Sequence, residues 1–356
     1  MILTIEKINS EGAGLARHNV AGHGGKIYFV PWTAPGDVVL VQIEKDHRDY
    51  AEARILEIIE KSSDRVDPPC PYFSRCGGCQ LQHLSYESQL KWKREILVDA
   101  LKRIARLPEV QVEPMIPSYK IWNYRSRIQL QQDATGKVGF FKGKSHDIVE
   151  IESCLIADER LNEKMKKGIT VGGELRVDDS TGFTQINPEQ NKKLIELVVQ
   201  YAEINSDDRV IDLYCGNGNF TFSLAALSKK VWGVEINSDS LVNAQKKAEA
   251  LQIKNISWIS GSSKNALAQL RKEGVVCDVM LVDPPRQGLE EAMEEILSFA
   301  PRRFIYVSCN PATFARDAAQ LVKGGYLLER CQPVDMFPQT AHVELVSKFS
   351  RVKSPD

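Results

Sequence analysis

Short apolar segments alternate with helical segments from residue 187 onward, and this rhythm constrains the fold of the chain most strongly. Five strands are expected, at Arg209–Tyr214, Lys230–Val234, Ile256–Ile259, Asp278–Val282 and Arg303–Val307. Helices are expected near Thr221–Leu227, Asp239–Leu251, Ser263–Glu273, Glu290–Phe299 and Thr313–Lys323. Apolar strands separated by helices form a parallel sheet that is covered on both faces.

Two further elements are expected to flank this alternation. Asn187-Pro188 offers a helix cap followed by proline at the first helical position, so a helix is expected from there to Ala202. Tyr326–Met336 and Val343–Val352 lack helical spacing and are expected to form an antiparallel pair. Residues 181–356 are therefore predicted to form a Rossmann-like α/β domain, which is the last of three predicted domains.

The N-terminal part of the chain has a different character. Residues 1–61 hold short segments rich in β-branched residues and divided by glycines, which is typical of a small OB-type β-barrel. Residues 62–180 are predicted to form a central, β-rich domain, in which the helical stretch Ser85–Arg106 is followed by strand-like alternation over 122–180. The fold class is thus multidomain α/β.

Composition excludes several classes of protein. With 43% hydrophobic and 26% charged residues, the 356-residue chain is an ordinary globular protein, without a segment of the roughly 18 apolar residues that span a membrane. We expect a cytoplasmic protein with no membrane partner and no obligate protein partner. The net charge of −1, taken by itself, argues against a nucleic-acid-binding protein. However, Lys91–Lys144 holds 12 basic and 5 acidic residues, interleaved with Trp92, Trp122 and Tyr124, and is either a solvated face or a phosphate-tracking patch.

A glycine-rich turn follows the first expected strand of the sheet. Gly216 and Gly218 let the backbone approach a ligand, and Glu235 ends the next strand, where it can reach a ribose diol. The turn lacks the dinucleotide pattern G-x-G-x-x-G because Thr221 stands at its last glycine position. Together these residues predict a site for S-adenosylmethionine (SAM), the alternative being a plain strand–turn–helix corner.

Two more strand ends carry chemically distinctive residues. Asp283-Pro284-Pro285-Arg286 ends the fourth strand; Arg286 replaces the aromatic residue of amino-group methyltransferases and argues against that reaction. Cys309 ends the fifth strand between Ser308 and Asn310. A thiolate is a strong nucleophile, and the helix that begins just after Cys309 is expected to lower its pKa. The alternative is a small buried hydrophobe, which we assign to Cys277 and Cys331.

Three cysteines form a cluster of their own, C-x5-C-x2-C at Cys70, Cys76 and Cys79. Structural disulfides are not expected in a cytosolic chain, so the cluster indicates a metal site. Thiolates suit either zinc or an iron–sulfur cluster, and the spacing departs from the paired C-x2-C of zinc ribbons.

These motifs resemble the RNA uracil-C5 methyltransferases over nearly the whole chain. The family's cysteine loop S-C-N-P-x-T-x-x-R-D is matched by 308–317, its D-P-P-R-x-G element by Asp283–Gly288 and its closing motif by 335–344. Gly12–Lys45 is similar to the family's TRAM module, an OB-like RNA-binding barrel, and Cys70–Lys91 to the iron–sulfur segment of its ribosomal members.

The resemblance implies roles for particular residues. Cys309 attacks C6 of uracil, and Glu344 removes the C5 proton. The implied SAM-binding residues are Gln185, Tyr214, Asn219, Glu235, Ser262 and Asp283, although the family usually carries Asn or Asp where Ser262 stands. Cys154 becomes the fourth ligand, beside Cys70, Cys76 and Cys79, of a [4Fe-4S] cluster, which is favoured over zinc.

The resulting hypothesis is SAM-dependent methylation of uridine C5 in RNA. The cluster together with the TRAM module favours 23S rRNA, with the target uridine flipped out of a single-stranded loop or bulge. Three alternatives stay open: a tRNA substrate for the same chemistry, an RNA cytosine-C5 methyltransferase, and a non-catalytic RNA-binding iron–sulfur protein. The cytosine enzymes usually carry Pro-Cys, whereas Ser308 precedes Cys309 here.

Overall fold

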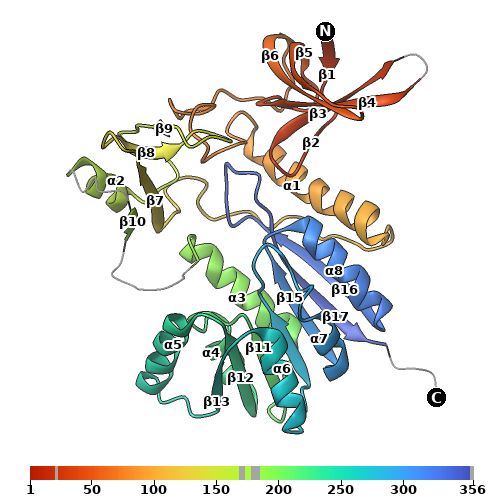
Figure 1. The fold of residues 1–356 in the computed structure, drawn as a ribbon, viewed down its shortest axis with the longest axis vertical. Coiled ribbons are helices and arrows are strands. Elements are labelled where there is room, and N and C mark those ends of the chain that lie inside the picture. Colours follow the sequence, from red (N-terminus) through yellow and green to blue (C-terminus); the bar gives the residue numbers. More distant parts are fainter. Residues whose placement is uncertain (21–22, 168–172, 178–184, 353–356) are drawn as a thin grey trace. The chain divides into compact units, whose positions relative to one another are not determined.

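The computed structural model describes residues 1–20, 23–167, 173–177 and 185–352 (Figure 1). The chain divides into two compact units, each made of segments that are distant in sequence. Unit 1 comprises Met1–Ile96, Pro117–Asp178 and Phe337–His342, and unit 2 comprises Leu97–Ile116, Asp179–Met336 and Val343–Asp356. Among the described residues, none of the helices has the length and apolarity needed to cross a membrane.

Unit 2 is built on a seven-stranded sheet in the order β13-β12-β11-β14-β15-β17-β16. Its strands are β11 (Arg209–Leu213), β12 (Lys230–Glu235), β13 (Ile256–Ser260), β14 (Val279–Val282), β15 (Arg303–Ser308), β16 (Tyr326–Val334) and β17 (Glu344–Arg351). The first five run parallel, and β17 lies antiparallel between β15 and β16. The predicted parallel sheet and terminal antiparallel pair are confirmed.

Helices cover this sheet in two layers (Figure 1). They are α3 (Pro188–Ala202), α4 (Thr221–Ala225), α5 (Ser238–Ala250), α6 (Ser263–Lys272), α7 (Met293–Phe299) and α8 (Pro311–Lys323). Helix α3 contacts α4, while α6, α7 and α8 contact one another in turn. As predicted, α3 begins after Asn187, whose side chain accepts a hydrogen bond from the backbone N–H of Gln190.

The sheet between these layers is the main core of unit 2. All four residues of β14 are buried, and rings of Phe304, Tyr306, Phe314 and Phe349 pack edge to face. This continuous apolar packing explains why the strands read as apolar runs without alternation. It also holds the strand ends, where the candidate site residues lie, on a rigid base.

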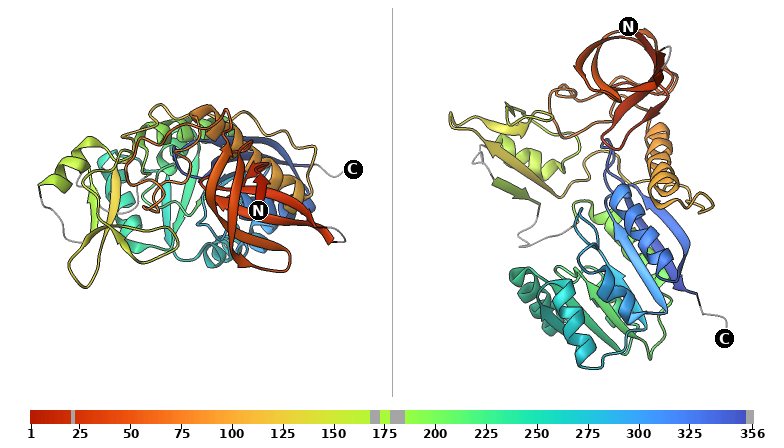
Figure 2. Two further views of the ribbon diagram at one scale, coloured as in Figure 1. Left: turned by 90° about the horizontal axis from the view of Figure 1, so that it is seen from above. Right: turned by 45° about the vertical axis from the view of Figure 1, so that its right-hand side comes forward.

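Unit 1 begins with a six-stranded sheet in the order β1-β5-β6-β4-β3-β2, which curls on itself (Figure 2). The strands are β1 (Ile2–Thr4), β2 (Lys7–Ile8), β3 (Ala13–Val20), β4 (His23–Pro31), β5 (Val38–Asp46) and β6 (Tyr50–Glu60). Gly12 and Gly14 are among the glycines that divide the short segments of residues 1–61 in the sequence, so a strand at the position of β3 was not expected. Gly14 lies in the strand instead, where a Cβ would come within 2.0 Å of the Thr33 hydroxyl oxygen.

The remainder of unit 1 is mixed rather than purely β-rich. A four-stranded sheet has the order β10-β7-β8-β9, with β7 (Arg127–Gln132), β8 (Val138–Phe141), β9 (Ile148–Val149) and β10 (Gly173–Arg176). Helix α2 (Glu159–Lys166), capped by Asp158, was not expected. The expected helix over Ser85–Arg106 is present as α1 (Tyr86–Ala100) and a π-helical turn, Leu101–Ala105.

Candidate active site

Cys309 directly follows strand β15, and Glu344 is the first residue of the neighbouring strand β17. Strands β15 and β17 are antiparallel, and their last pair is Ser308 with Leu345, so Cys309 directly follows this pair and Glu344 directly precedes it. Glu344 is 3% exposed, whereas Cys309 keeps part of its surface. The sheet therefore places a thiol and a carboxyl group at the carboxyl ends of its parallel strands, although 34 residues of chain lie between them.

Asp283 and Tyr214, two further residues of the predicted site, also lie at the carboxyl ends of the parallel strands. Strand β14 pairs with both β11 and β15, aligning Val282 with Leu213 and with Tyr306. Asp283 and Tyr214 immediately follow these strands at their carboxyl ends. Strands β11 and β14 are neighbours although β12 and β13 separate them in sequence, and such a change of strand order is where open α/β sheets bind ligands.

The protein raises the pKa of each acidic group in this cluster. Burial raises the pKa of Asp283 to about 7, and burial and the charge of Asp283 raise the pKa of Glu344 well above its usual range. Burial, followed by the charges of Glu344 and Asp283, raises the pKa of the Cys309 thiol to about 11, against a smaller opposing effect of Arg286. The prediction that the following helix lowers the pKa of Cys309 is wrong, because burial and two carboxylates dominate.

The glycine turn between β11 and α4 is held by the carboxylate of Glu235. The backbone N–H of Gly216 donates to Glu235 Oε2 at 2.9 Å, and that of Asn237 donates to Oε1 at 2.7 Å. Gly216 and Gly218 both adopt positive φ, +53° and +81°. A Cβ on Gly216 would meet no atom within 4 Å, so the backbone there faces open space that a ligand can approach.

The remaining cofactor candidates are held by local hydrogen bonds. Asn219 exchanges two side-chain hydrogen bonds, of 2.8 and 3.0 Å, with Asn191 of α3. Gln185 is half-buried and lies two residues ahead of the Asn187 cap of that helix. Ser262 caps α6, accepting a hydrogen bond from the N–H of Asn265 at 3.3 Å, so its hydroxyl already serves the helix.

Asp212 also belongs to this region, although no role was predicted for it from sequence. It is fully buried on β11, it accepts a 2.5 Å hydrogen bond from the Thr221 hydroxyl, and its Oδ1 atom has no hydrogen-bond partner. Burial raises its pKa to about 7, with a contribution from the charges of Asp283 and Glu235. Its position on the expected strand that leads into the glycine turn was the only signal in the sequence.

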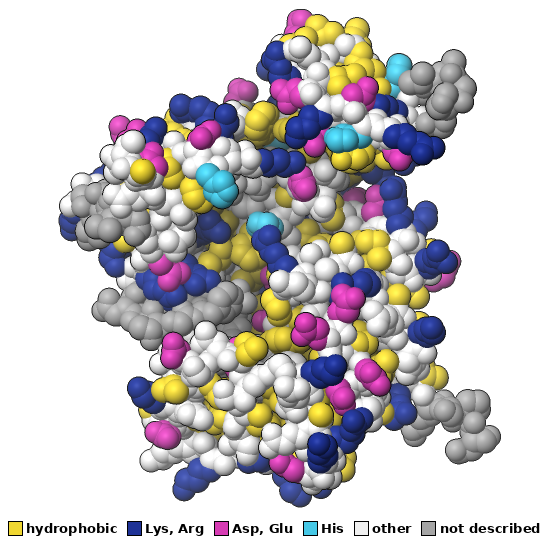
Figure 3. Space-filling model, in the orientation of Figure 1, with side chains coloured by type: hydrophobic (Ala, Val, Ile, Leu, Met, Phe, Trp, Pro, Cys, Tyr) yellow, Lys and Arg dark blue, Asp and Glu magenta, His cyan; other side chains and the backbone are white. Residues whose placement is uncertain are grey.

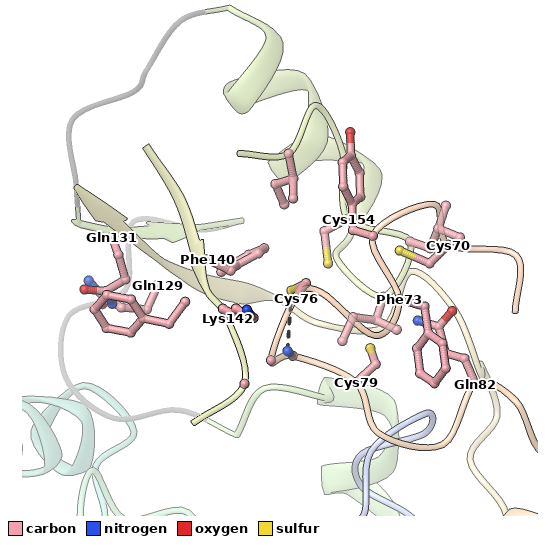
Figure 4. A pocket seen from close by; sticks show the side chains of 18 of the residues that line it. Cys70, Phe73, Cys76, Cys79, Gln82, Gln129, Gln131, Phe140, Lys142 and Cys154 are labelled. Carbon is pink, nitrogen blue, oxygen red and sulfur yellow. Dashed lines mark hydrogen bonds between the residues drawn. The ribbon is translucent and has the colours of Figure 1, made fainter. Parts of the chain in front are cut away.

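In unit 1, the four cysteines of the predicted metal site line one cavity of about 550 Å³ (Figure 4). Cys70, Cys76 and Cys79 reach it from the segment before α1, and Cys154 from the segment before α2. Within the described parts of the chain, no three His, Cys, Asp or Glu side chains are arranged to hold a single metal ion.

Hydrogen-bond donors nevertheless point at three of these sulfur atoms. The N–H of Gly78 donates to Cys76 Sγ at 3.4 Å, the Gln82 side chain to Cys79, and the backbone of 156–157 to Cys154. Burial raises the pKa of Cys79 to about 12 and also raises those of Cys76 and Cys154. Arg125 lines the same cavity, its charge opposes the rise at Cys76 and Cys154, and its buried Nε has no hydrogen-bond partner.

The basic segment Lys91–Lys144 is less cationic at its surface than its composition indicates. Lys93 is buried and donates to the carbonyl oxygen of Phe337 at 2.9 Å. Other members form ion pairs, which are Arg94–Glu95, Arg103–Asp99, Arg127–Glu174, Lys137–Glu150 and Lys144–Glu11. On the face seen in Figure 3, basic and acidic side chains are interspersed, in line with the net charge of −1.

Comparison with known proteins links both units to RNA modification. Residues 172–351 match the family model described as tRNA (Uracil-5-)-methyltransferase, and residues 2–56 match the TRAM domain. The chain is 31% identical to an uncharacterized RNA methyltransferase of Halalkalibacterium halodurans, over 97% of this chain and 95% of the relative. It is 32% identical to one of Bacillus cereus, over 99% and 96%.

A solved structure extends this likeness to the fold. The Pyrococcus abyssi tRNA (uracil-54, C5)-methyltransferase, in complex with S-adenosyl-L-homocysteine, superposes with a TM-score of 0.72 at 25% identity. The superposition covers 98% of this chain and 100% of that one.

Proposed function

Because the chain belongs to the tRNA (uracil-5-)-methyltransferase family of SAM-dependent RNA methyltransferases, we propose that it methylates uridine C5 in RNA with Cys309 as nucleophile and Glu344 as base. The observation that supports this proposal is that Cys309 directly follows, and Glu344 directly precedes, the Ser308–Leu345 pair of β15 and β17, with the charge of Glu344 acting on the Cys309 thiol. The nucleophile attacks C6 and the base removes the proton from C5, and these are adjacent atoms of one ring. The two groups must therefore lie close together in the folded protein.

The proposed chemistry proceeds in three steps. The Cys309 thiolate adds to C6, and the electrons of the C5–C6 double bond move to form an enolate. C5 then attacks the methyl group of the sulfonium, whose bond to sulfur breaks to give S-adenosylhomocysteine. Glu344 takes the C5 proton, the double bond re-forms and the thiolate leaves. The raised pKa of Glu344 makes it a stronger base once it is ionised.

The methyl donor is proposed to lie along the glycine turn, beside the open space at Gly216. Glu235 would accept from its ribose hydroxyls; each carboxylate oxygen already accepts one backbone N–H but has a second lone pair available. Gln185, Tyr214, Asn219 and Asp283 complete the proposed set. Ser262 has the weakest support of the proposed residues, because its hydroxyl caps α6.

For the cysteine-lined cavity we propose a [4Fe-4S] cluster held by Cys70, Cys76, Cys79 and Cys154. Thiolates that bind different irons of one cluster need not converge on a single ion. The N–H donors at the sulfur atoms and the charge of Arg125 both stabilise thiolates, as cluster ligation requires. Iron and sulfide analysis of the protein purified without oxygen should give about four of each per chain. Bound zinc, or no metal, would refute the cluster.

The proposed substrate is 23S rRNA, because the proposed cluster and the TRAM domain occur together. An rRNA substrate would place the enzyme in the cytoplasm. The proposed domains are residues 1–61, 62–180 and 181–356. A tRNA substrate is the second candidate, favoured by the name of the Pyrococcus abyssi neighbour. Nucleoside mass spectrometry of rRNA and tRNA from wild-type and deletion cells separates the two: loss of 5-methyluridine from tRNA alone would exclude rRNA.

Product analysis also decides between the remaining alternatives. A cytosine-C5 enzyme would yield 5-methylcytidine in the same experiment. A non-catalytic RNA-binding protein would leave the nucleosides of the deletion strain unchanged.

A further inference from the structure

Asp317, in the first turns of α8, is a fully buried carboxylate that the proposed chemistry does not use. Its Oδ2 atom accepts two hydrogen bonds of 2.8 Å, one from the backbone N–H of Leu289 and one from the Tyr306 hydroxyl. Its Oδ1 atom accepts from Nε of Arg316 at 3.0 Å. One carboxylate thus joins α8, the strand that leads to Cys309, and the loop after Asp283.

Arg316 fastens the same loop at a second point. Its guanidinium donates to the carbonyl oxygen of Gln287 at 2.7 Å and to Glu290 at 3.1 Å. Gly288 lies between these two bonds with φ of +80°, and a Cβ there would come within 2.3 Å of Asp317 Oδ2. The loop can therefore reach Arg316 and Asp317 only if a glycine stands at 288.

The fastened loop, residues 284–289, lies between two groups of the proposed active site. Asp283 immediately precedes it, and Asn310, which follows Cys309, donates from Nδ2 to the carbonyl oxygen of Arg286 at 3.3 Å. Three backbone groups, at 286, 287 and 289, are thus bound by side chains from the first two turns of α8 and the residue that caps it.

We propose that Asp317 and Arg316 are positioning residues, which hold the loop 284–289 against the start of α8 and thereby fix Asp283 relative to Cys309. This inference rests on the proposed function, since it matters only if Cys309 is the nucleophile. Neither residue touches the reacting atoms. A shift of about 1 Å in such a pair of groups can slow a reaction by roughly 100-fold.

Asp317→Asn tests this inference, and Tyr306→Phe is its matched control. An amide at 317 has only one acceptor oxygen, so its NH2 group faces a donor at either Arg316 or Leu289, and the attachment of the loop is weakened. Tyr306→Phe removes a buried hydrogen bond to the same Oδ2 atom but keeps the bond to Leu289. Both variants lose a buried hydrogen bond, and only Asp317→Asn disturbs the groups that hold the loop.

The assay measures kcat, the KM values for SAM and RNA, and the rate of covalent adduct formation with 5-fluorouridine RNA, each corrected for the folded fraction. We expect Asp317→Asn to lower kcat and the adduct rate by about 10-fold or more, with smaller changes in KM. Gly288→Ala should do the same without removing any donor or acceptor. Arg316→Lys, which keeps one donor for Gln287, should retain more activity than Arg316→Gln.

Equal kcat and adduct rates in Asp317→Asn and Tyr306→Phe, at equal folded fraction, would overturn the positioning role. If Asp317→Asn does not fold, Gly288→Ala decides, and normal kcat in that variant would refute the inference. The wild-type protein in the same assay tests the proposed function separately. Absence of both 5-methyluridine and adduct there would remove the proposed function, whatever the variants do.

Discussion

The ionisation of Cys309 offers the sharpest test of the site, because sequence and structure predict opposite shifts. Burial and the neighbouring carboxylates raise the pKa of this thiol from 9.0 to about 11. Two pKa units correspond to about 3 kcal/mol, or roughly 100-fold less thiolate at neutral pH. A helix N-terminus acting alone would have increased the thiolate fraction instead.

Alkylation by iodoacetamide, followed at the Cys309 peptide by mass spectrometry, measures the thiolate directly. In the free enzyme, the rate should rise about tenfold per pH unit from pH 7 to 10, without reaching a plateau. Glu344→Gln should move the midpoint to lower pH, since it removes a negative neighbour, and yet abolish methylation. A plateau below pH 9 in the wild-type protein would refute the reasoning.

Three further predictions concern other parts of the site. Cys309→Ala should abolish both methylation and the adduct with 5-fluorouridine RNA, measured by mass spectrometry and denaturing gel; persistence of both would exclude the mechanism. The folded-state pKa of Asp212, about 7, lies above its unfolded value, so its stabilising effect is complete below about pH 4 and is lost as pH rises through 7. Asp212→Asn, which stays neutral, should therefore be a few kcal/mol more stable than the wild-type protein to urea at pH 8, but not at pH 4, and parallel pH profiles would contradict this. Cys154→Ser should lower the iron content of the purified chain while the surface change Lys246→Ser leaves it intact, and equal iron in both would exclude Cys154 as a ligand.

The elements of unit 2 were largely predictable because their signals are local. Asn187-Pro188 starts α3 where a capping side chain and a fixed φ predict it, and the apolar strands needed only their length and burial. Strand β3 was missed because Gly14 is a glycine for a tertiary reason, the close approach of Thr33, and not because the strand breaks there. Helix α2 was missed for a local reason, because it lies in a part of the chain that was expected to be β-rich.

The residues of the site were likewise predictable where their signals are local, and their properties were not where these depend on distant parts of the chain. Strand ends located Cys309 and Asp283 from sequence, and family resemblance added Glu344. The pKa of Cys309 could not be predicted, because it depends on a carboxylate 35 positions away and on burial by the completed fold. Likewise, Arg316 and Asp317 were visible only as letters of a motif, since their partners at 287–289 become neighbours only when β14 and β15 pair.

The antiparallel insertion of β17 also bears on how the enzyme is made. A ribosome releases β15 and β16 before β17, so the nucleophile strand leaves the tunnel while the position between these two strands is still empty. During that interval one side of β15 has no hydrogen-bonded neighbour. An unpaired strand can pair with strands of other chains, which leads to aggregation. The last strand to enter the sheet brings Glu344 with it. Closing the sheet and completing the pair of reactive groups are thus a single event in the maturation of the nascent chain.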